Sequence, residues 1–327
     1  MKTHISTDNF GGYTRYKLLN EDTGEYIYVI PDCGGILQAL VLWRKYQQNE
    51  ATDKINLYSV IDGVSEDELP ENSWYRSSFL FPFPGRIRDG KYTFEGKTYQ
   101  LPINETSRNN ALHGLVFDKK FMPEVIGDET LALKYSYDGS LEGYPFPFEI
   151  SIFYTAPVSG NFGWKVTIKN TGVSNLPYGF GWHPYFNTGT PVDKLNISFP
   201  ATSGFESDKQ MIPTGKRLPA KQFSRQYSKK DATNLNNTNY DNCFGIGWKK
   251  EILLADAEKN LLLTMQQNQF DFVQLYTPPD RQSIAIEPQT CLANAFNEKN
   301  SLYNCQTLAT EQEVNFEWHI FLQKMKK

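Results

Sequence analysis

Apolar and polar residues alternate strictly in several short segments of the chain. In residues 164–169, Trp164, Val166 and Ile168 alternate with lysine and threonine, and residues 314–320 repeat this pattern near the C-terminus. A period of two residues places every second side chain on the same face of an extended strand. Both segments are therefore predicted to be β-strands with one buried face.

Further strands are predicted where β-branched and aromatic residues cluster between Gly, Pro, Asn or Asp. These segments are residues 26–30, 36–43, 131–137, 149–155, 261–265, 272–276 and 283–286. Residues 93–99 are predicted to form a hairpin around Glu95-Gly96, and residues 253–265 a second hairpin around residues 258–260. The only helical candidate is residues 65–74, which Pro70 interrupts.

Many short strands with almost no helix predict an all-β fold, a large antiparallel β-sandwich. A chain of 327 residues has the length for one large domain or two smaller ones, and either would bury a sizeable core. Because no segment reads as a linker, residues 1–327 are predicted to form a single domain. Residues 204–239 are the most polar stretch and are expected to leave the sheet as a long excursion.

Composition supports the all-β prediction and limits the expected partners. Aromatic residues make up 14% of the chain, with 19 Tyr and 22 Phe, and such residues favour half-buried pleated sheets. The formal net charge is −4, and no block of basic residues could neutralise a run of phosphates. Nucleic acid is therefore not an expected partner.

No targeting or membrane segment is predicted. The first ten residues lack the apolar core of a signal peptide, and no later stretch approaches the roughly 18 apolar residues of a membrane span. Cysteines occur at four scattered positions without a Cys-x-x-Cys spacing, so free and mostly buried thiols are expected. The sequence predicts a soluble, cytoplasmic protein with no membrane partner.

Two segments combine one titratable side chain with aromatic residues, prolines and apolar strand. Residues 181–186 carry His183, and residues 285–290 carry Glu287. An imidazole and a carboxylate that share a pocket can deliver a proton to one atom of a ligand while removing a proton from another. His183 and Glu287 are therefore the candidate catalytic pair.

Four further polar residues are candidates for ligand binding. Arg86 lies in an irregular, apolar, Pro- and Gly-rich segment, where it could bind hydroxyls or a phosphate, or pair with a carboxylate for structure. His113 ends a polar loop beside Gly114, and a loop histidine is more often surface or filler. Asp241 lies in an Asn- and Asp-rich turn. Gln274 is a polar residue in an otherwise apolar strand. Its amide either forms hydrogen bonds within the core or faces a ligand.

In chain order, these segments resemble the motifs of the aldose 1-epimerase (galactose mutarotase-like) family. Any one motif is weak, but six in the right order are a strong signal. The matching segments are Gly85-Arg86-Ile87 with the following Gly90-Lys-Tyr-Thr-Phe, Leu112-His-Gly114, His183-Pro-Tyr-Phe-Asn187, Asp241, Gln274-Leu-Tyr-Thr277 and Glu287-Pro-Gln289.

The resemblance implies a large antiparallel β-sandwich of the galactose mutarotase-like supersandwich type, with a sugar cleft on one face. It also implies interconversion of the α and β anomers of a free aldose. By the resemblance, Glu287 is the general base at the anomeric hydroxyl and His183 is the general acid at the ring oxygen. Arg86, His113, Asp241 and Gln274 match substrate-holding positions. Hemiacetal opening needs no cofactor or metal. Trp182, Tyr185 and Phe186 are candidate walls of the cleft, because aromatic rings suit the C–H faces of a sugar. Aromatic residues in a sandwich are, however, more often part of the core.

Departures from the family pattern leave the substrate open. Leu115 stands where many members have a second Gly, and Trp182-His183-Pro184 replaces the Asn-His-Ser of galactose mutarotases. Galactose specificity therefore does not follow. With Arg86 and Arg88 nearby, a hexose 6-phosphate 1-epimerase is one alternative. A non-catalytic carbohydrate-binding protein of the same fold is the second, and a metal-dependent hydrolase or lyase that uses the same histidines and carboxylates is the third. The sequence specifies neither the sugar nor the oligomeric state.

Overall fold

The computed structural model describes residues 2–44, 56–220, 233–247, 250–267, 269–298 and 305–325. Within these residues, the strands form sheets of nine, eight and five strands and three two-stranded sheets. The helical segments of the same residues are two single 3-10 turns, η1 (Val192–Lys194) and η3 (Ala295–Asn297). The prediction of an all-β fold is confirmed.

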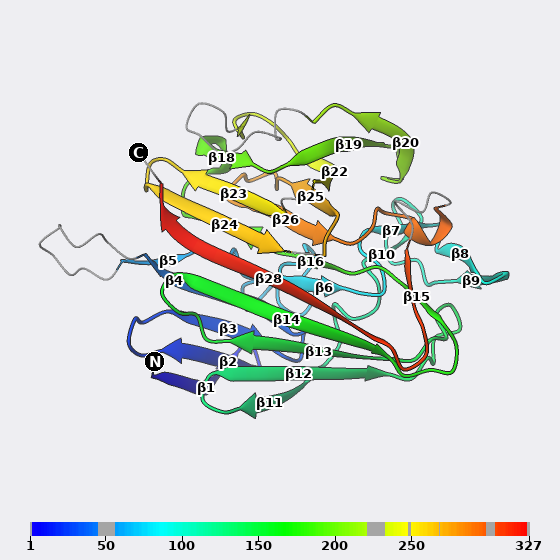
Figure 1. The fold of residues 1–327 in the computed structure, drawn as a ribbon, viewed down its shortest axis with the longest axis horizontal. Coiled ribbons are helices and arrows are strands. Elements are labelled where there is room, and N and C mark those ends of the chain that lie inside the picture. Colours follow the sequence, from blue (N-terminus) through cyan, green and yellow to red (C-terminus); the bar gives the residue numbers. More distant parts are fainter. Residues whose placement is uncertain are drawn as a thin grey trace, which may run out of the picture.

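The nine-stranded sheet forms one face of the molecule (Figure 1). Neighbouring strands along it are antiparallel. In spatial order, they are β11 (Met122–Ile126), β12 (Thr130–Tyr137), β13 (Phe148–Thr155), β14 (Asn161–Asn170), β28 (Glu313–Lys324), β24 (Leu261–Gln267), β23 (Glu251–Asp256), β18 (Leu195–Ser198) and β21 (Thr233–Asn234).

The eight-stranded sheet carries most of the candidate site residues. Its strands are, in spatial order, β20 (Pro213–Leu218), β19 (Ala201–Ser207), β22 (Asp241–Ile246), β25 (Phe272–Tyr276), β26 (Ile284–Gln289), β16 (Gly181–His183) and β6 (Ser78–Leu80), with β17 (Tyr185–Phe186) also paired to β26.

The five-stranded sheet continues the layer of the eight-stranded sheet. It contains β1 (Thr3–Phe10), β2 (Tyr13–Asn20), β3 (Tyr26–Ile30), β4 (Ile36–Arg44) and β5 (Asn56–Ser59). Just after β5, the Asp62 N–H donates to the Tyr185 carbonyl on β17 at 2.8 Å. The two-stranded sheets pair β7 (Arg86–Arg88) with β10 (Asn110–Leu112), β8 (Lys91–Phe94) with β9 (Lys97–Gln100), and β15 (Leu176–Tyr178) with β27 (Gln306–Leu308).

Three buried tryptophans hold the nine- and eight-stranded sheets together. Trp164 on β14 contacts Trp182 on β16 with ring centroids 5.3 Å apart, and Trp182 contacts Trp318 on β28 at 6.1 Å. The edge-to-face geometry of these rings is the favoured arrangement for aromatic pairs. Since each tryptophan points inward from its strand, the two sheets pack face to face as a sandwich.

The strand predictions from alternation and residue type are confirmed. The predicted segments lie in β3, β4, β12, β13, β14, β24, β25, β26 and β28. Both hairpins are also present. Strands β8 and β9 turn at Glu95 and Gly96, which have φ values of 47° and 80°, and β23 pairs with β24. Positive φ at both central residues is the signature of a type I′ turn, for which glycine is well suited. The single domain over residues 1–327 stays a prediction.

Two local predictions are wrong. Residues 65–74 form separate turns and not a helix, because Pro70 has no N–H to continue the hydrogen bonds that Leu69 donates to Ser65 and Asn72 to Glu68. In the polar stretch 204–239, the prediction of a long excursion is wrong for the residues in strands, and β21 pairs with β18 in the nine-stranded sheet. Strands β19 and β20 pair there and extend the eight-stranded sheet, while residues 221–232 lie outside the described residues.

Candidate active site

The register of the eight-stranded sheet sets four functional side chains side by side. Gln274 on β25 pairs with Glu287 on β26 and with Cys243 on β22. Strands β16 and β17 pair with β26 in one common register, which sets His183 opposite Glu287. Directly opposed residues of antiparallel strands point to the same face. His183, Glu287, Gln274 and Cys243 therefore form one row across four strands.

A second set of side chains lies on the same face, two residues along these strands. Since side chains alternate between faces, Tyr185, Tyr276, Asp241 and Gln289 point the same way as the first row. All of them, with the first row, line a cavity of about 320 Å³. This volume lies within the range of roughly 300–1,000 Å³ that is typical of small-molecule sites. One face of the sheet therefore forms the floor of the cavity.

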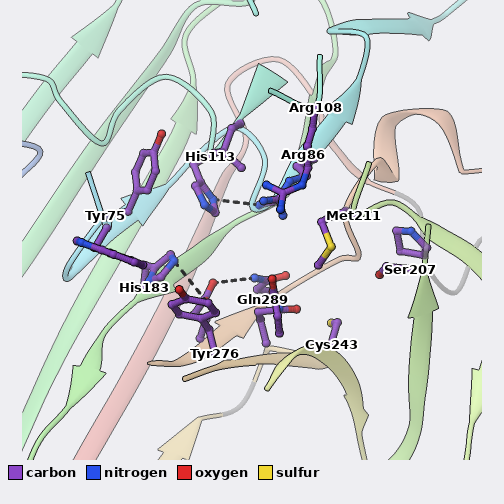
Figure 2. Close-up of a pocket in the computed structure, with 18 of the residues that line it drawn as sticks. Tyr75, Arg86, Arg108, His113, His183, Ser207, Met211, Cys243, Tyr276 and Gln289 are labelled. Atoms are coloured by element: carbon purple, nitrogen blue, oxygen red, sulfur yellow. Dashed lines mark hydrogen bonds and ion pairs between the residues drawn. The ribbon is translucent and has the colours of Figure 1, made fainter. Parts of the chain in front are cut away.

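Loops and the small sheet β7–β10 supply the walls. Trp74 and Tyr75 come from the loop of residues 72–77, Arg86 from the start of β7, and His113 from the residue after β10. Met211 comes from the turn between β19 and β20. Figure 2 shows Tyr75, His183 and Tyr276 on one side of the cavity and Met211 and Ser207 on the other, with Arg86 above.

His183 and Glu287 lie in direct contact at the cavity floor. The His183 Nε2 atom is 3.4 Å from Glu287 Oε1, and the two residues are only 6% and 2% exposed. The His183 ring stacks on Tyr185 at 5.2 Å and on Tyr75 at 6.3 Å. Gln289 donates its amide N–H to the second oxygen of Glu287 at 3.2 Å. These contacts fix both catalytic candidates in orientation.

Burial shifts the pKa values of this pair in opposite directions. It lowers the pKa of His183 to about 3. Burial, followed by the charge of Asp241, raises the pKa of Glu287 well above its usual 4.5. A buried environment disfavours the charged form of either group. Burial therefore favours a neutral His183 and a protonated Glu287 over an ion pair of the two.

His113 is a neutral hydrogen-bond donor at the cavity wall. Its Nδ1 accepts the backbone N–H of Gly85 at 3.3 Å, so the ring proton lies on Nε2. Burial, with smaller effects of His183 and Arg86, lowers the pKa of His113 well below its usual 6.5. The left-handed backbone of His113, with a φ of 62°, turns this ring toward His183, 5.3 Å away between ring centroids.

Arg86 serves the structural role that the sequence left open, and it also lines the cavity. Its Nε and one terminal nitrogen donate to the two carboxylate oxygens of Glu105, both at 2.9 Å. Arg108 donates to the same carboxylate at 2.9 Å and Asn110 at 2.8 Å. Burial opposes ionisation of Glu105, but these hydrogen bonds outweigh it and lower its pKa to about 2. One carboxylate thus pairs with two guanidinium groups of the cavity wall and offsets part of their charge.

Arg88 is not among the residues that line the cavity. It pairs with Asp208 at 2.5 Å and also donates to the side chain of Gln210. Gln210 in turn accepts a hydrogen bond from Asn110 on its backbone carbonyl at 3.0 Å. These contacts tie the turn of residues 208–212 to β7 and β10, and so hold Met211 against the cavity.

All six residues proposed from the sequence line the one cavity: Arg86, His113, His183, Asp241, Gln274 and Glu287. Gln274 donates its amide N–H to Asp241 at 2.9 Å, so this amide faces the cavity and not the core. Burial raises the pKa of Asp241. Of the three suggested aromatic walls, Tyr185 lines the cavity, whereas Trp182 and Phe186 are fully buried in the core. Side chains alternate between the two faces of a strand. Trp182 and Phe186 lie one and three positions from His183, so they point to the opposite face.

Several residues that line the cavity are not among the site residues predicted from the sequence. Gln289 and Tyr276 follow Glu287 and Gln274 by two residues, so the period of a strand would have found them. Trp74, Tyr75, Arg108 and Met211 lie on loops without any such period. Only the long-range packing of those loops brings them to the cavity.

Two features are absent from the described ranges of the chain. There, no three His, Cys, Asp or Glu side chains are grouped so that they could hold a metal ion. Over the same ranges, the helices are too short for one to cross a membrane.

Comparison with known sequences agrees with the motifs. The family profile described as aldose 1-epimerase matches residues 20–320. The uncharacterized protein YihR of Escherichia coli is 30% identical over 67% of this chain and 70% of its own length. Galactose mutarotase of Rattus norvegicus is 28% identical over 54% of this chain and 50% of its own, so the alignment spans half of that relative.

Solved structures share the fold at low sequence identity. A galactose mutarotase-like protein of Clostridium acetobutylicum matches with a TM-score of 0.81 at 19% identity, and the match covers 99% of each chain. Galactose 1-epimerase of Lactobacillus acidophilus matches with a TM-score of 0.76 at 16% identity over the full length of both chains. Together with the profile match across 20–320, these findings establish that the chain belongs to the aldose 1-epimerase family.

Proposed function

We propose that the protein is an aldose 1-epimerase that interconverts the α and β anomers of a neutral free aldose. The observation that carries this proposal is the buried His183–Glu287 contact of 3.4 Å at the floor of the cavity. An acid and a base on neighbouring strands can act on the two neighbouring oxygens of a hemiacetal. The surrounding aromatic, amide and imidazole groups suit the C–H faces and hydroxyls of a sugar.

The proposed reaction moves two protons and breaks one bond. Glu287 accepts the proton of the anomeric hydroxyl while His183 donates a proton to the ring oxygen, and the C1–O5 bonding electrons pass to that oxygen. The resulting aldehyde rotates about its C1–C2 bond. Closure on the other face reverses both proton transfers and gives the other anomer.

At the open-chain stage of the proposed reaction, the proton lies on Glu287 and His183 is neutral. Burial favours this arrangement, because it lowers the pKa of His183 and raises that of Glu287. Ring opening in the proposed sense needs the proton on His183, and the 3.4 Å contact lets it pass directly from Oε1 to Nε2. Donors near Glu287, such as the Gln289 amide, favour its ionised form once a sugar is bound.

The charges of the cavity wall favour a neutral sugar over a sugar phosphate. Glu105 already pairs with both Arg86 and Arg108, and Arg88 already pairs with Asp208. The negative charges of Glu105 and Asp208 offset part of the positive charge of these guanidinium groups and so weaken their attraction for a phosphate. The free aldose is therefore the better-supported substrate class, and the hexose 6-phosphate is the alternative.

The decisive experiment measures anomer exchange directly. Saturation-transfer NMR of equilibrated glucose, galactose, xylose and the hexose 6-phosphates should show enzyme-dependent exchange between the anomers of at least one neutral aldose. Exchange confined to the 6-phosphates would support the phosphosugar alternative instead. Spontaneous rates for every sugar, together with measurable sugar binding by calorimetry, would support a non-catalytic binding protein. Activity lost with a chelator and restored by a divalent ion would support metal-dependent chemistry.

Replacing Glu105 with glutamine tests the charge balance. The change leaves Arg86 and Arg108 without their shared carboxylate, so the cavity wall gains positive charge. We expect the ratio of kcat/KM for a hexose 6-phosphate to that for the neutral hexose to rise about tenfold, because an unpaired guanidinium binds phosphate well. The exposed Glu129→Gln on the loop before β12 removes the same charge as a control. An unchanged ratio in Glu105→Gln would contradict the proposal that the charge of Glu105 disfavours a phosphate in the cavity.

A further inference from the structure

The two ends of the cavity differ in polarity. His183 lies at one end, beside the carboxylate that it contacts (Figure 2). Met211, Ser207 and Cys243 lie at the other end. Pro213, two residues after Met211, also lines the cavity. Apart from the Ser207 hydroxyl, these side chains present carbon and sulfur atoms, and we call Met211, Pro213 and Cys243 the apolar end of the cavity.

Cys243 contributes an apolar surface to this end. Its side chain packs against the buried cluster of Phe205, Phe272 and Leu292. Burial, followed by the charge of Glu287, raises the pKa of the thiol, so the sulfur stays protonated at neutral pH. A protonated, buried thiol behaves as a small hydrophobic group. Cys243 therefore suits an apolar group of a ligand better than a hydroxyl.

Met211 is held in place by its own turn. Its N–H donates to the Asp208 carbonyl at 3.0 Å, and the Asp208 N–H donates to the Ile212 carbonyl at 2.9 Å. Met211 has a left-handed backbone with a φ of 60°, which persists in a residue other than glycine where its surroundings enforce it. The thioether is therefore presented to the cavity from a defined position.

The roles proposed for His183 and Glu287 determine which part of a sugar faces the apolar end. His183 serves the ring oxygen and Glu287 the anomeric hydroxyl, so C5 lies on the His183 side of the reacting centre and C2 on the Glu287 side. Strand β22, which carries Cys243, lies two strands beyond β26 in the direction away from β16. Two strand spacings amount to about 10 Å. A hydroxyl at C2 is too short to reach Cys243, whereas a longer substituent at C2 can reach it.

We infer that the apolar end receives the methyl group of a 2-acetamido substituent, so that the substrates include 2-acetamido-2-deoxyhexoses. The inference rests on the proposed function. These sugars undergo the same two proton transfers and the same cleavage and re-formation of the C1–O5 bond. The acetamido group takes no part in the reaction, because only the hemiacetal reacts.

Polar groups that suit the amide lie beside the apolar end. Asp241 precedes Cys243 by two residues on β22 and so points to the same face. Gln274 donates to Oδ1 of Asp241 at 2.9 Å, and Oδ2 can accept the amide N–H. The charge of Arg86 acts to lower the pKa of Asp241, against the larger effect of burial, so the two side chains lie near each other. Arg86 uses Nε and one terminal nitrogen for Glu105, and its other terminal nitrogen can donate to the amide carbonyl.

The test compares sugars that differ only at C2. Anomer exchange is measured by saturation-transfer NMR for glucose, N-acetylglucosamine, 2-deoxyglucose and glucosamine. We expect kcat/KM for N-acetylglucosamine to exceed that for glucose about tenfold, mainly through KM, because a buried methyl group and an added hydrogen bond each strengthen binding several-fold. Glucosamine should fall below glucose, since its ammonium group would lie near Arg86. The 2-deoxy sugar should not exceed glucose either, because it lacks the methyl group.

Substitutions at the apolar end should act selectively on the acetamido sugar. Met211→Asn replaces the thioether by a polar amide and should bring the ratio of kcat/KM for N-acetylglucosamine to that for glucose close to one. Cys243→Ser keeps the size of the side chain and should lower the ratio about threefold, because the methyl group would then cover a hydroxyl that water had hydrated. Met122→Asn is the matched control. Met122 is 65% exposed on β11, and its replacement should leave the ratio unchanged.

Three outcomes overturn the inference. The first is a wild type that turns over N-acetylglucosamine no better than glucose, and the second is 2-deoxyglucose matching N-acetylglucosamine. The third is a parallel loss for both sugars in a Met211→Asn variant whose thermal unfolding is unchanged. If no sugar is turned over at all, the proposed function fails instead. Calorimetric affinities of N-acetylglucosamine and glucose for the wild type and Met211→Asn then still decide whether the apolar end binds the acetamido group.

Discussion

Glu287→Gln is expected to lower anomer exchange by about 10²–10⁴-fold, the usual contribution of one positioned acid or base. Glutamine keeps the shape of the side chain and can still accept the hydrogen bond from Gln289, but it cannot take up the proton of a hydroxyl. The loss should fall on kcat, measured by saturation-transfer NMR at saturating sugar. The matched control Glu124→Gln lies exposed on β11 and should retain full turnover. Comparable activity in Glu287→Gln would remove Glu287 from the reaction.

The same substitution is expected to stabilise the protein at neutral pH. Burial raises the folded-state pKa of Glu287 above its usual 4.5, so its contribution to stability is complete below that value and is lost as pH rises through the raised pKa. An amide has no such loss. We expect Tm to rise by about 1–3 °C at pH 8 and the gain to vanish near pH 4, measured by calorimetry. A lower Tm at pH 8 would contradict this protonation state.

His183→Asn is the second substitution with a large expected effect, again a loss of about 10²–10⁴-fold in kcat. Asparagine retains a polar group at the end of the strand but cannot exchange a proton. Because His183 and Glu287 act on one reaction as a unit, the double variant should lose hardly more than either single variant. Additive losses would mean that the two residues act in separate steps.

The pH profile of the wild type distinguishes His183 from an ordinary histidine. Burial lowers its pKa to about 3, so the pair gains a second proton only in strong acid. The acid limb of kcat/KM should therefore lie below about pH 5, and the alkaline limb should follow the raised pKa of Glu287. A decline centred on pH 6.5 would show that His183 titrates as an exposed imidazole does. His319, exposed on β28, is the matched control: His319→Asn should leave the profile unchanged.

Sequence periodicity predicted those parts of the fold in which one strand face is buried. Strand β14, with its alternating Trp164, Val166 and Ile168, is such a case. The pattern fails for β1, which has no fully buried residue over its eight positions, because a strand without a buried face carries no alternation. It also fails for three-residue strands such as β7 and β10, which are too short to establish a period.

The candidate site likewise contains residues that the sequence could predict and residues that depend on long-range packing. His183 and Glu287 stand out in the sequence because each residue type is chemically unusual in an apolar strand, and the structure sets them 3.4 Å apart. The sequence offered no way to know that Glu105 balances Arg86, since the two lie on different segments and meet only through the packing of β7 beside β10. Trp74 and Met211 were missed because their place depends on loop backbone that no local pattern encodes.

The cavity floor and its walls also differ in how they can change over evolution. The floor depends on the alternation of four paired strands, so inserting one residue within β25 or β26 would turn Gln274 or Glu287 to the opposite face. The turn of residues 208–212 lies outside that ladder and is tied to β7 and β10 instead, so its length and side chains are less constrained by the contact between His183 and Glu287. Residues 72–77 are bound more closely to the floor, because Tyr75 stacks on His183 and Ser77 donates its N–H to the His183 carbonyl.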